Sequence, residues 1–190
     1  KQHSSICTSP FTRAEFSYVC GRSDLYSLRE SRLLDAHHAL RKDLGKIEAA
    51  SALVKALIAS QPLGKVAMKM YEMFIWCLQR ISYAEEEEKV VSFFMVKTLL
   101  HEGRLHLQDS CNACGCGLKE VHIYEGECLC AQHSGTYGAL LYSREDIVDM
   151  HALAYATTAA SFEKGAYSKG LAAGVERLFS CAYEYRNSIV

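Results

Sequence analysis

The sequence predicts a mainly α fold: a helical core with a small zinc-binding β ribbon inserted before a C-terminal helical segment. Two observations predict it. Apolar residues recur at helical spacing along most of the 190-residue chain, which is 49% hydrophobic. Five of the nine cysteines fall between Cys111 and Cys130, among glycines and short alternating segments. We therefore expect a helical domain at residues 1–103, which includes a candidate helix-turn-helix, a zinc ribbon at 104–137 and a helical segment at 138–190.

The N-terminal helices are predicted from spacing and from breakers. Residues 12–20 are expected to form a short helix that ends at Gly21. Ser27-Leu28-Arg29-Glu30 has the spacing of a capping box, in which a serine accepts from a backbone N–H three residues on. Apolar positions then continue at helical spacing toward Gly45, namely Leu33, Leu34, His37, Leu40 and Leu44.

Three further helices are expected before the ribbon. One covers residues 46–59 and stops at Gln61-Pro62-Leu63-Gly64, since proline and glycine both oppose continuation. Residues 65–81 are apolar on almost every face, which predicts the central core helix. The acidic run Glu85–Glu88 precedes a third apolar stretch that ends at Gly103, and carboxylates at a helix N-terminus complement the macrodipole.

The segment after the ribbon is expected to form two helices, at about 144–160 and 162–187. Ser143 stands where an N-cap is needed, directly before the first of them. In the second, Gly170 and Gly174 are four residues apart, and small residues at that spacing allow close helix packing within the chain or with a partner.

A metal site is predicted from two knuckles. Cys111-Asn112-Ala113-Cys114 is a C-x2-C pair followed by Gly115 and Gly117, which help the chain turn. After 15 further residues, Cys130-Ala131-Gln132-His133 repeats the two-residue spacing. Four protein ligands of this softness suit one Zn2+ ion and leave no position for a catalytic water, so the site is expected to be structural.

Two other thiols compete for ligand roles. Cys116 and Cys128 lie beside the knuckles, and either could replace one of the four ligands Cys111, Cys114, Cys130 and His133. We favour the pair Cys130 and His133 because C-x2-H closes a knuckle more readily than C-x-C. A cluster of reduced cysteines or a disulfide is the alternative to a metal site.

No catalytic motif accompanies the metal site. His101 and His106 are five residues apart, whereas a zincin helix needs four. The sequence has no phosphate-binding loop, no nucleophile elbow and no dinucleotide fingerprint. We therefore expect the protein not to be an enzyme.

Charge points to the N-terminal quarter for nucleic-acid contacts. The whole chain has a net charge of -1, but residues 1–46 carry eight Lys or Arg against five Asp or Glu, a balance of +3. The candidate DNA-binding residues in this quarter are Arg22, Arg29, Arg32, Arg41 and Lys42. No apolar run approaches the roughly 20 residues that a membrane span needs, and no signal peptide is recognised, so a cytoplasmic protein without membrane contact is expected.

A longer stretch around the first knuckle resembles a known family. The segment Glu102-Gly103-Arg104-Leu105-His106-Leu107, followed by Gln108-Asp109-Ser110-Cys111-Asn112-Ala113-Cys114-Gly115, is similar to the FlhC family, the zinc-binding subunit of FlhD/FlhC-type transcriptional activators. In that family an apolar helix ends in a glycine, and Leu-x-Leu leads into C-x-x-C-G. Here His133 stands where the family has a fourth cysteine, and about 55 residues follow the ribbon in place of a short basic tail. The tail suits divergent homologues of conjugative elements better.

The resemblance implies a function. It predicts a DNA-binding activator subunit that acts in a hetero-oligomer with an FlhD-like partner, binds promoter DNA, contacts RNA polymerase and holds one structural Zn2+ through Cys111, Cys114 and Cys130, with His133 as a replacement ligand. The alternative is a zinc-ribbon adaptor that binds RNA polymerase or another host or phage factor without touching DNA.

Overall fold

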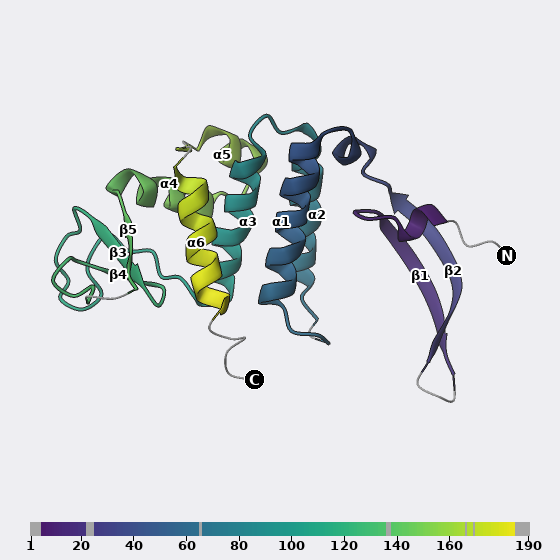
Figure 1. Ribbon diagram of the computed structural model, residues 1–190, viewed down its shortest axis with the longest axis horizontal. Helices are drawn as coiled ribbons and strands as arrows, with labels where there is room; N and C mark the ends of the chain where they lie inside the picture. Colours follow the sequence, from purple (N-terminus) through teal and green to yellow (C-terminus); the bar gives the residue numbers. More distant parts are fainter. Residues whose placement is uncertain are drawn as a thin grey trace.

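The computed structural model describes residues 5–21, 25–64, 66–135, 138–165, 167–168 and 170–184. Along the long axis of the molecule lie a β-hairpin at one end, a helical bundle in the middle and a small three-stranded sheet at the other end (Figure 1). The expected combination of helices and small sheets is confirmed: about half of the described residues are helical, and the strands form two small sheets. No helix in the described ranges combines the length and the apolar character that crossing a bilayer requires.

The N-terminal quarter is a hairpin, and its helix prediction was wrong. After a short 3-10 turn at Ser5–Thr8, strands β1 (Arg13–Cys20) and β2 (Tyr26–Asp35) pair antiparallel and project away from the bundle (Figure 1). Phe16 lies opposite Ser31 and Tyr18 opposite Leu28. Because the structure has strands where these two helices were predicted, the helix-turn-helix prediction was also wrong.

The physical reason lies in the side chains of β1. Ala14, Phe16 and Tyr18 alternate with polar or exposed neighbours, and aromatic residues favour a pleated strand over a helix. A capping box stabilises a helix only at the point where one begins. The capping-box spacing at Ser27 therefore did not outweigh the cross-strand pairing of β1 with β2.

A second 3-10 turn, His38–Lys42, connects the hairpin to the bundle. Helix α1 (Leu44–Ser60) begins where the Asp43 side chain accepts from the Lys46 backbone N–H. Helices α2 (Met68–Tyr83) and α3 (Glu87–His101) follow. The three helices predicted here are confirmed, with shifted ends.

Helix α3, and not the segment at 65–81, is the central helix. Helices α1, α2, α4 and α6 all pack against α3, which buries Phe94, Val96 and Leu99 completely. Helix α2 keeps one side in solvent, where Met68 is 61% exposed. Even Lys89 of α3 is buried, because its Nζ donates to the Gly165 carbonyl at 2.8 Å.

The ribbon contains strands β3 (Val121–Tyr124), β4 (Glu127–Leu129) and β5 (Leu140–Tyr142), ordered β4-β3-β5. Its apolar side chains belong to the same buried core as the helices, in particular Leu105, Leu107, Leu118, Val121 and Ile123. Arg104 also links the ribbon to α6, because its side chain donates a hydrogen bond to the Ala182 carbonyl at 2.6 Å. The ribbon is therefore packed onto the bundle.

Three helices make up the C-terminal segment, where two were predicted. They are α4 (Arg144–Tyr155), α5 (Ala159–Lys164) and α6 (Leu171–Glu184). The predicted cap at Ser143 is confirmed as a complete capping box with Asp146. A second capping box at Thr158 starts α5, which explains why the first predicted helix ends early.

Of the two spaced glycines, Gly174 makes a close contact within the chain. A methyl group at Gly174 would lie 2.9 Å from Cε1 of the buried Tyr142, whose hydroxyl donates to the Gly174 carbonyl at 2.7 Å. A methyl group at Gly170 would meet no atom within 4 Å. Close packing is thus a property of Gly174 and joins α6 to β5.

We predict that Gly174→Ala is less stable than Gly170→Ala by about 1–3 kcal/mol, the usual cost of overpacking. Alanine favours a helix over glycine, so without the Tyr142 contact Gly174→Ala would be neutral or stabilising. Urea unfolding of both variants measures the difference. Equal midpoints would show that the Tyr142 ring moves aside at no cost.

Candidate metal centre

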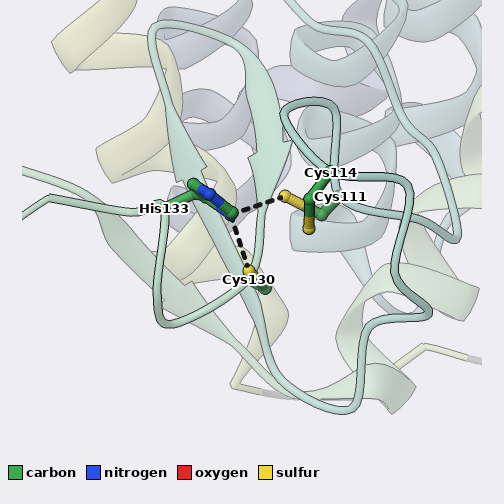
Figure 2. A group of neighbouring side chains, drawn as sticks. All are labelled: Cys111, Cys114, Cys130 and His133. Carbon is green, nitrogen blue, oxygen red and sulfur yellow. Dashed lines mark hydrogen bonds between the residues drawn. The ribbon is translucent and has the colours of Figure 1, made fainter.

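Four side chains from the two ends of the ribbon meet at one point. The Cys111, Cys114, Cys130 and His133 ligand atoms all lie within 4.8 Å of one another. His133 turns its Nδ1 toward two sulfurs, 3.2 Å from Cys130 Sγ and 3.8 Å from Cys111 Sγ (Figure 2). The residues predicted from spacing alone are thus the residues that the fold brings together, and they could hold a metal ion.

Backbone hydrogen bonds shape both knuckles. In the first, the Gly115 N–H donates to the Cys111 carbonyl at 2.8 Å, with Gly115 at a φ of +72° that a side chain would disfavour. In the second, the His133 and Ser134 N–H groups both donate to the Cys130 carbonyl at 2.9 Å. Each turn therefore places its ligand pair on one side.

The first knuckle is also bonded to the sheet and across its own turn. The Asn112 N–H donates to the Cys128 carbonyl at 2.9 Å, which ties the first knuckle to β4. The Cys111 N–H donates to the Cys116 carbonyl at 2.8 Å. These bonds limit how far the two ligand pairs can separate.

The electrostatics of the cluster favour thiolates. Burial alone would raise the pKa of Cys111, but backbone hydrogen bonds with Cys130, Cys114 and Ala113 outweigh it and lower this pKa to about 6. The hydrogen bond to His133 lowers the pKa of Cys130, and the same contact raises the pKa of His133. Cys111 and Cys130 are thus favoured as thiolates, the form of cysteine that binds metal.

The structure separates the two competing thiols. Cys128 is fully buried, and its Sγ donates to the His106 carbonyl at 3.4 Å, so it faces the ribbon core and not the cluster. Cys116 is exposed and lies beside the cluster, where its contact with Cys114 raises its pKa to about 12. Cys116 is not one of the four residues whose ligand atoms lie within 4.8 Å of one another.

The predicted DNA-binding residues that the structure describes lie on two elements, β2 and the second 3-10 turn. Arg29 and Arg32 are exposed on β2, and Arg32 pairs with Glu15 at 3.4 Å. Arg41 donates to the Pro10 carbonyl at 3.1 Å and so holds the first turn of the chain. Lys42 ends the second 3-10 turn, and Arg22 lies outside the described residues.

The hairpin carries a row of aromatic side chains that was not predicted from the sequence. Phe16 and Tyr18 stack with ring centroids 6.4 Å apart, and Tyr26 lies 6.3 Å from Tyr18 edge-on. Tyr18 is 59% exposed and Tyr26 71% exposed. The alternation of β1 could have revealed the first two residues, but assigning a helix there put them on different faces.

Comparison with known proteins gives a clear direction. No family model matches the sequence. A protein of Chlamydia pneumoniae is 29% identical over 125 residues, which are 65% of this chain and 50% of the relative. Proteins of Chlamydia muridarum (28% over 102 residues, 53% of this chain and 43% of the relative) and Chlamydia trachomatis (30% over 90 residues, 46% and 37%) are also similar. All three are named DNA repair protein RecO. The chain spans half or less of the length of these RecO relatives.

The RecO relatives overturn the assignment to the FlhC family. They also contradict the predicted transcriptional activator function, the FlhD-like partner, the promoter DNA and the RNA polymerase contact. The adaptor alternative is contradicted as well. The physical reason is that C-x-x-C-G after a short strand is what a metal knuckle needs, so unrelated proteins arrive at the same letters.

We predict that Cys111→Ser releases metal and unfolds the ribbon, because metal binding energy is folding energy in such modules. The matched control is Cys116→Ser, which should keep one metal ion per chain and the wild-type hydrogen-exchange protection at residues 105–129. Elemental analysis and hydrogen exchange of the freshly purified, reduced variants measure both effects. Loss of metal from Cys116→Ser with retention in Cys111→Ser would reverse the ligand assignment.

Proposed function

We propose that this chain acts in DNA repair as a DNA-binding protein whose β1–β2 hairpin contacts single-stranded DNA. The DNA repair part rests on the RecO relatives. The DNA contact rests on one observation, the aromatic row Phe16–Tyr18–Tyr26, whose two tyrosines are exposed. The proposed role is binding and not catalysis, and a DNA repair role would place the protein in the cytoplasm.

The geometry of the row suits unpaired bases. Its central ring, Tyr18, leaves more than half of its surface open to solvent at 59% exposure. Every base has a π-face, so stacking on aromatic side chains tolerates any sequence and contributes about 1–3 kcal/mol per base. No side chain of β1 or β2 belongs to the buried core of the described chain, so the row is not needed to fold the bundle.

Charge on the same hairpin supports the proposal. Arg29 and Arg32 are both exposed on β2, within a few residues of Tyr26. The Arg32–Glu15 pair is largely exposed on both sides, and surface pairs of this kind stabilise a fold little. Arg32 can therefore exchange Glu15 for a phosphate at small cost, which joins electrostatic attraction to stacking.

The metal centre has a supporting role in this proposal. We propose Zn2+ as the ion, because three thiolates and one imidazole form the donor set that zinc prefers, and four protein ligands close the site. The ribbon lies at the opposite end of the molecule from the hairpin (Figure 1). Zinc would therefore stabilise the fold without touching the proposed DNA contact.

The test is fluorescence anisotropy with labelled oligothymidylate. We predict that replacing Tyr18 and Tyr26 together by alanine weakens binding by at least about tenfold, given the cost of lost stacking. Replacing both by phenylalanine should preserve binding, since the ring faces remain. Arg29→Ala should weaken binding less and lower its salt dependence.

The matched control is Tyr83→Ala, which removes an even more exposed tyrosine, 84% exposed, from the end of α2. It should bind as the wild type does. Unchanged affinity in the double alanine variant would contradict the proposal. Protection of the hairpin tyrosines from solvent by another protein segment would also contradict it, because the row would then be an interior surface.

A further inference from the structure

A groove crosses the helical bundle on a face that neither the metal centre nor the hairpin uses. Helices α1 and α6 both pack on α3, which lies between them in Figure 1, and they make few contacts with each other. Two adjoining cavities of about 580 and 420 Å3 occupy the space between them. The cavities share Glu48, Ala52, Met95 and Glu176, so they form one continuous groove.

The floor of the groove is apolar: small side chains line most of it, and Val91, Phe179 and Tyr183 also line it. Ala49, Ala52, Ala56 and Ala59 contribute from α1, Met95 from α3, and Ala172 and Ala173 from α6. Alanines on both walls let an incoming backbone approach closely. From Glu48 to Ala59 the groove follows α1 for roughly 16 Å, or about three helical turns.

The mouth of the groove is acidic. Glu48, Glu87, Glu88 and Glu176 line it, and Lys55 is the one cation that lines either cavity within the described chain. None of the four carboxylates belongs to an ion pair of the described residues. Glu87 and Glu88 suit the first turn of α3, but Glu48 and Glu176 lie inside their helices, where the macrodipole gives them no benefit.

We infer that this groove binds a basic amphipathic helix of a partner protein, with apolar residues on the alanine floor and Lys or Arg beside the four glutamates. Charge complementarity selects this occupant, because gathered carboxylates repel one another in the free protein and repel nucleic acid. A helix fits better than a strand because α1 and α6 offer ridges and no free strand edge. The inference does not depend on the proposed DNA contact.

The probe is a fluorescent synthetic peptide of leucine, alanine and lysine, with apolar residues at i, i+3, i+4 and i+7. Its matched partner carries glutamate in place of every lysine. We expect the full chain to bind the lysine peptide and not the glutamate peptide, with an affinity that falls as salt rises.

Two variants test whether the peptide binds in the groove. Charge reversal by Glu48→Lys with Glu176→Lys should weaken binding at least about tenfold, and Ala52→Leu should do the same by filling the floor. The control Glu72→Lys reverses an exposed charge on α2, outside the groove, and should bind normally. Circular dichroism and metal content of each variant confirm the fold.

Three results would overturn the inference. The lysine peptide fails to bind, it binds the groove variants as well as the wild type, or sedimentation shows a dimer that Ala52→Leu dissociates, which would make a second copy the occupant. Because the hairpin variants leave the groove intact, they should bind the peptide normally. A failed DNA proposal and a failed groove proposal are thus distinguishable.

Discussion

The closure of the ribbon around four ligand atoms is the constraint on which this end of the molecule depends. Cys111 and Cys114 come from one turn, Cys130 and His133 from another, and three strands of three or four residues lie near them. Strands this short are marginally stable unless something holds their ends. Because Leu105, Val121 and Ile123 share a core with the helices, closing the ribbon also completes one side of the bundle.

The bundle itself is organised by α3. Helix α2 packs against α3, and Lys89 near the start of α3 donates to the Gly165 carbonyl at the end of α5. The C-terminus of α3 leads directly into the ribbon at Arg104. Helices α1 and α6 pack on α3 and make few contacts with each other, which leaves the acidic groove between them. The hairpin lies outside this arrangement and presents aromatic side chains to solvent.

The ligand quartet could be predicted from the sequence because a metal knuckle is local: two residues between ligands determine which side chains meet. The bundle helices were predictable for a similar reason, since apolar spacing persists over several turns. The hairpin was not, because Ser27 to Glu30 satisfies a local helix rule that strand pairing overrides. The choice of α2 as the central helix failed too, since apolar content does not reveal which face another helix covers. Family membership failed because knuckle letters reflect metal chemistry more than ancestry.

X-ray absorption at the zinc edge of the purified, reduced protein tests the identity of the four ligands most directly. We predict three sulfurs at about 2.3 Å and one nitrogen at about 2.0–2.1 Å. The nitrogen signal should disappear in His133→Cys, with zinc retained. Four sulfurs in the wild-type protein would show that Cys116 displaces His133, and a shell with oxygen would show an open site. Either result would contradict the closed centre described above.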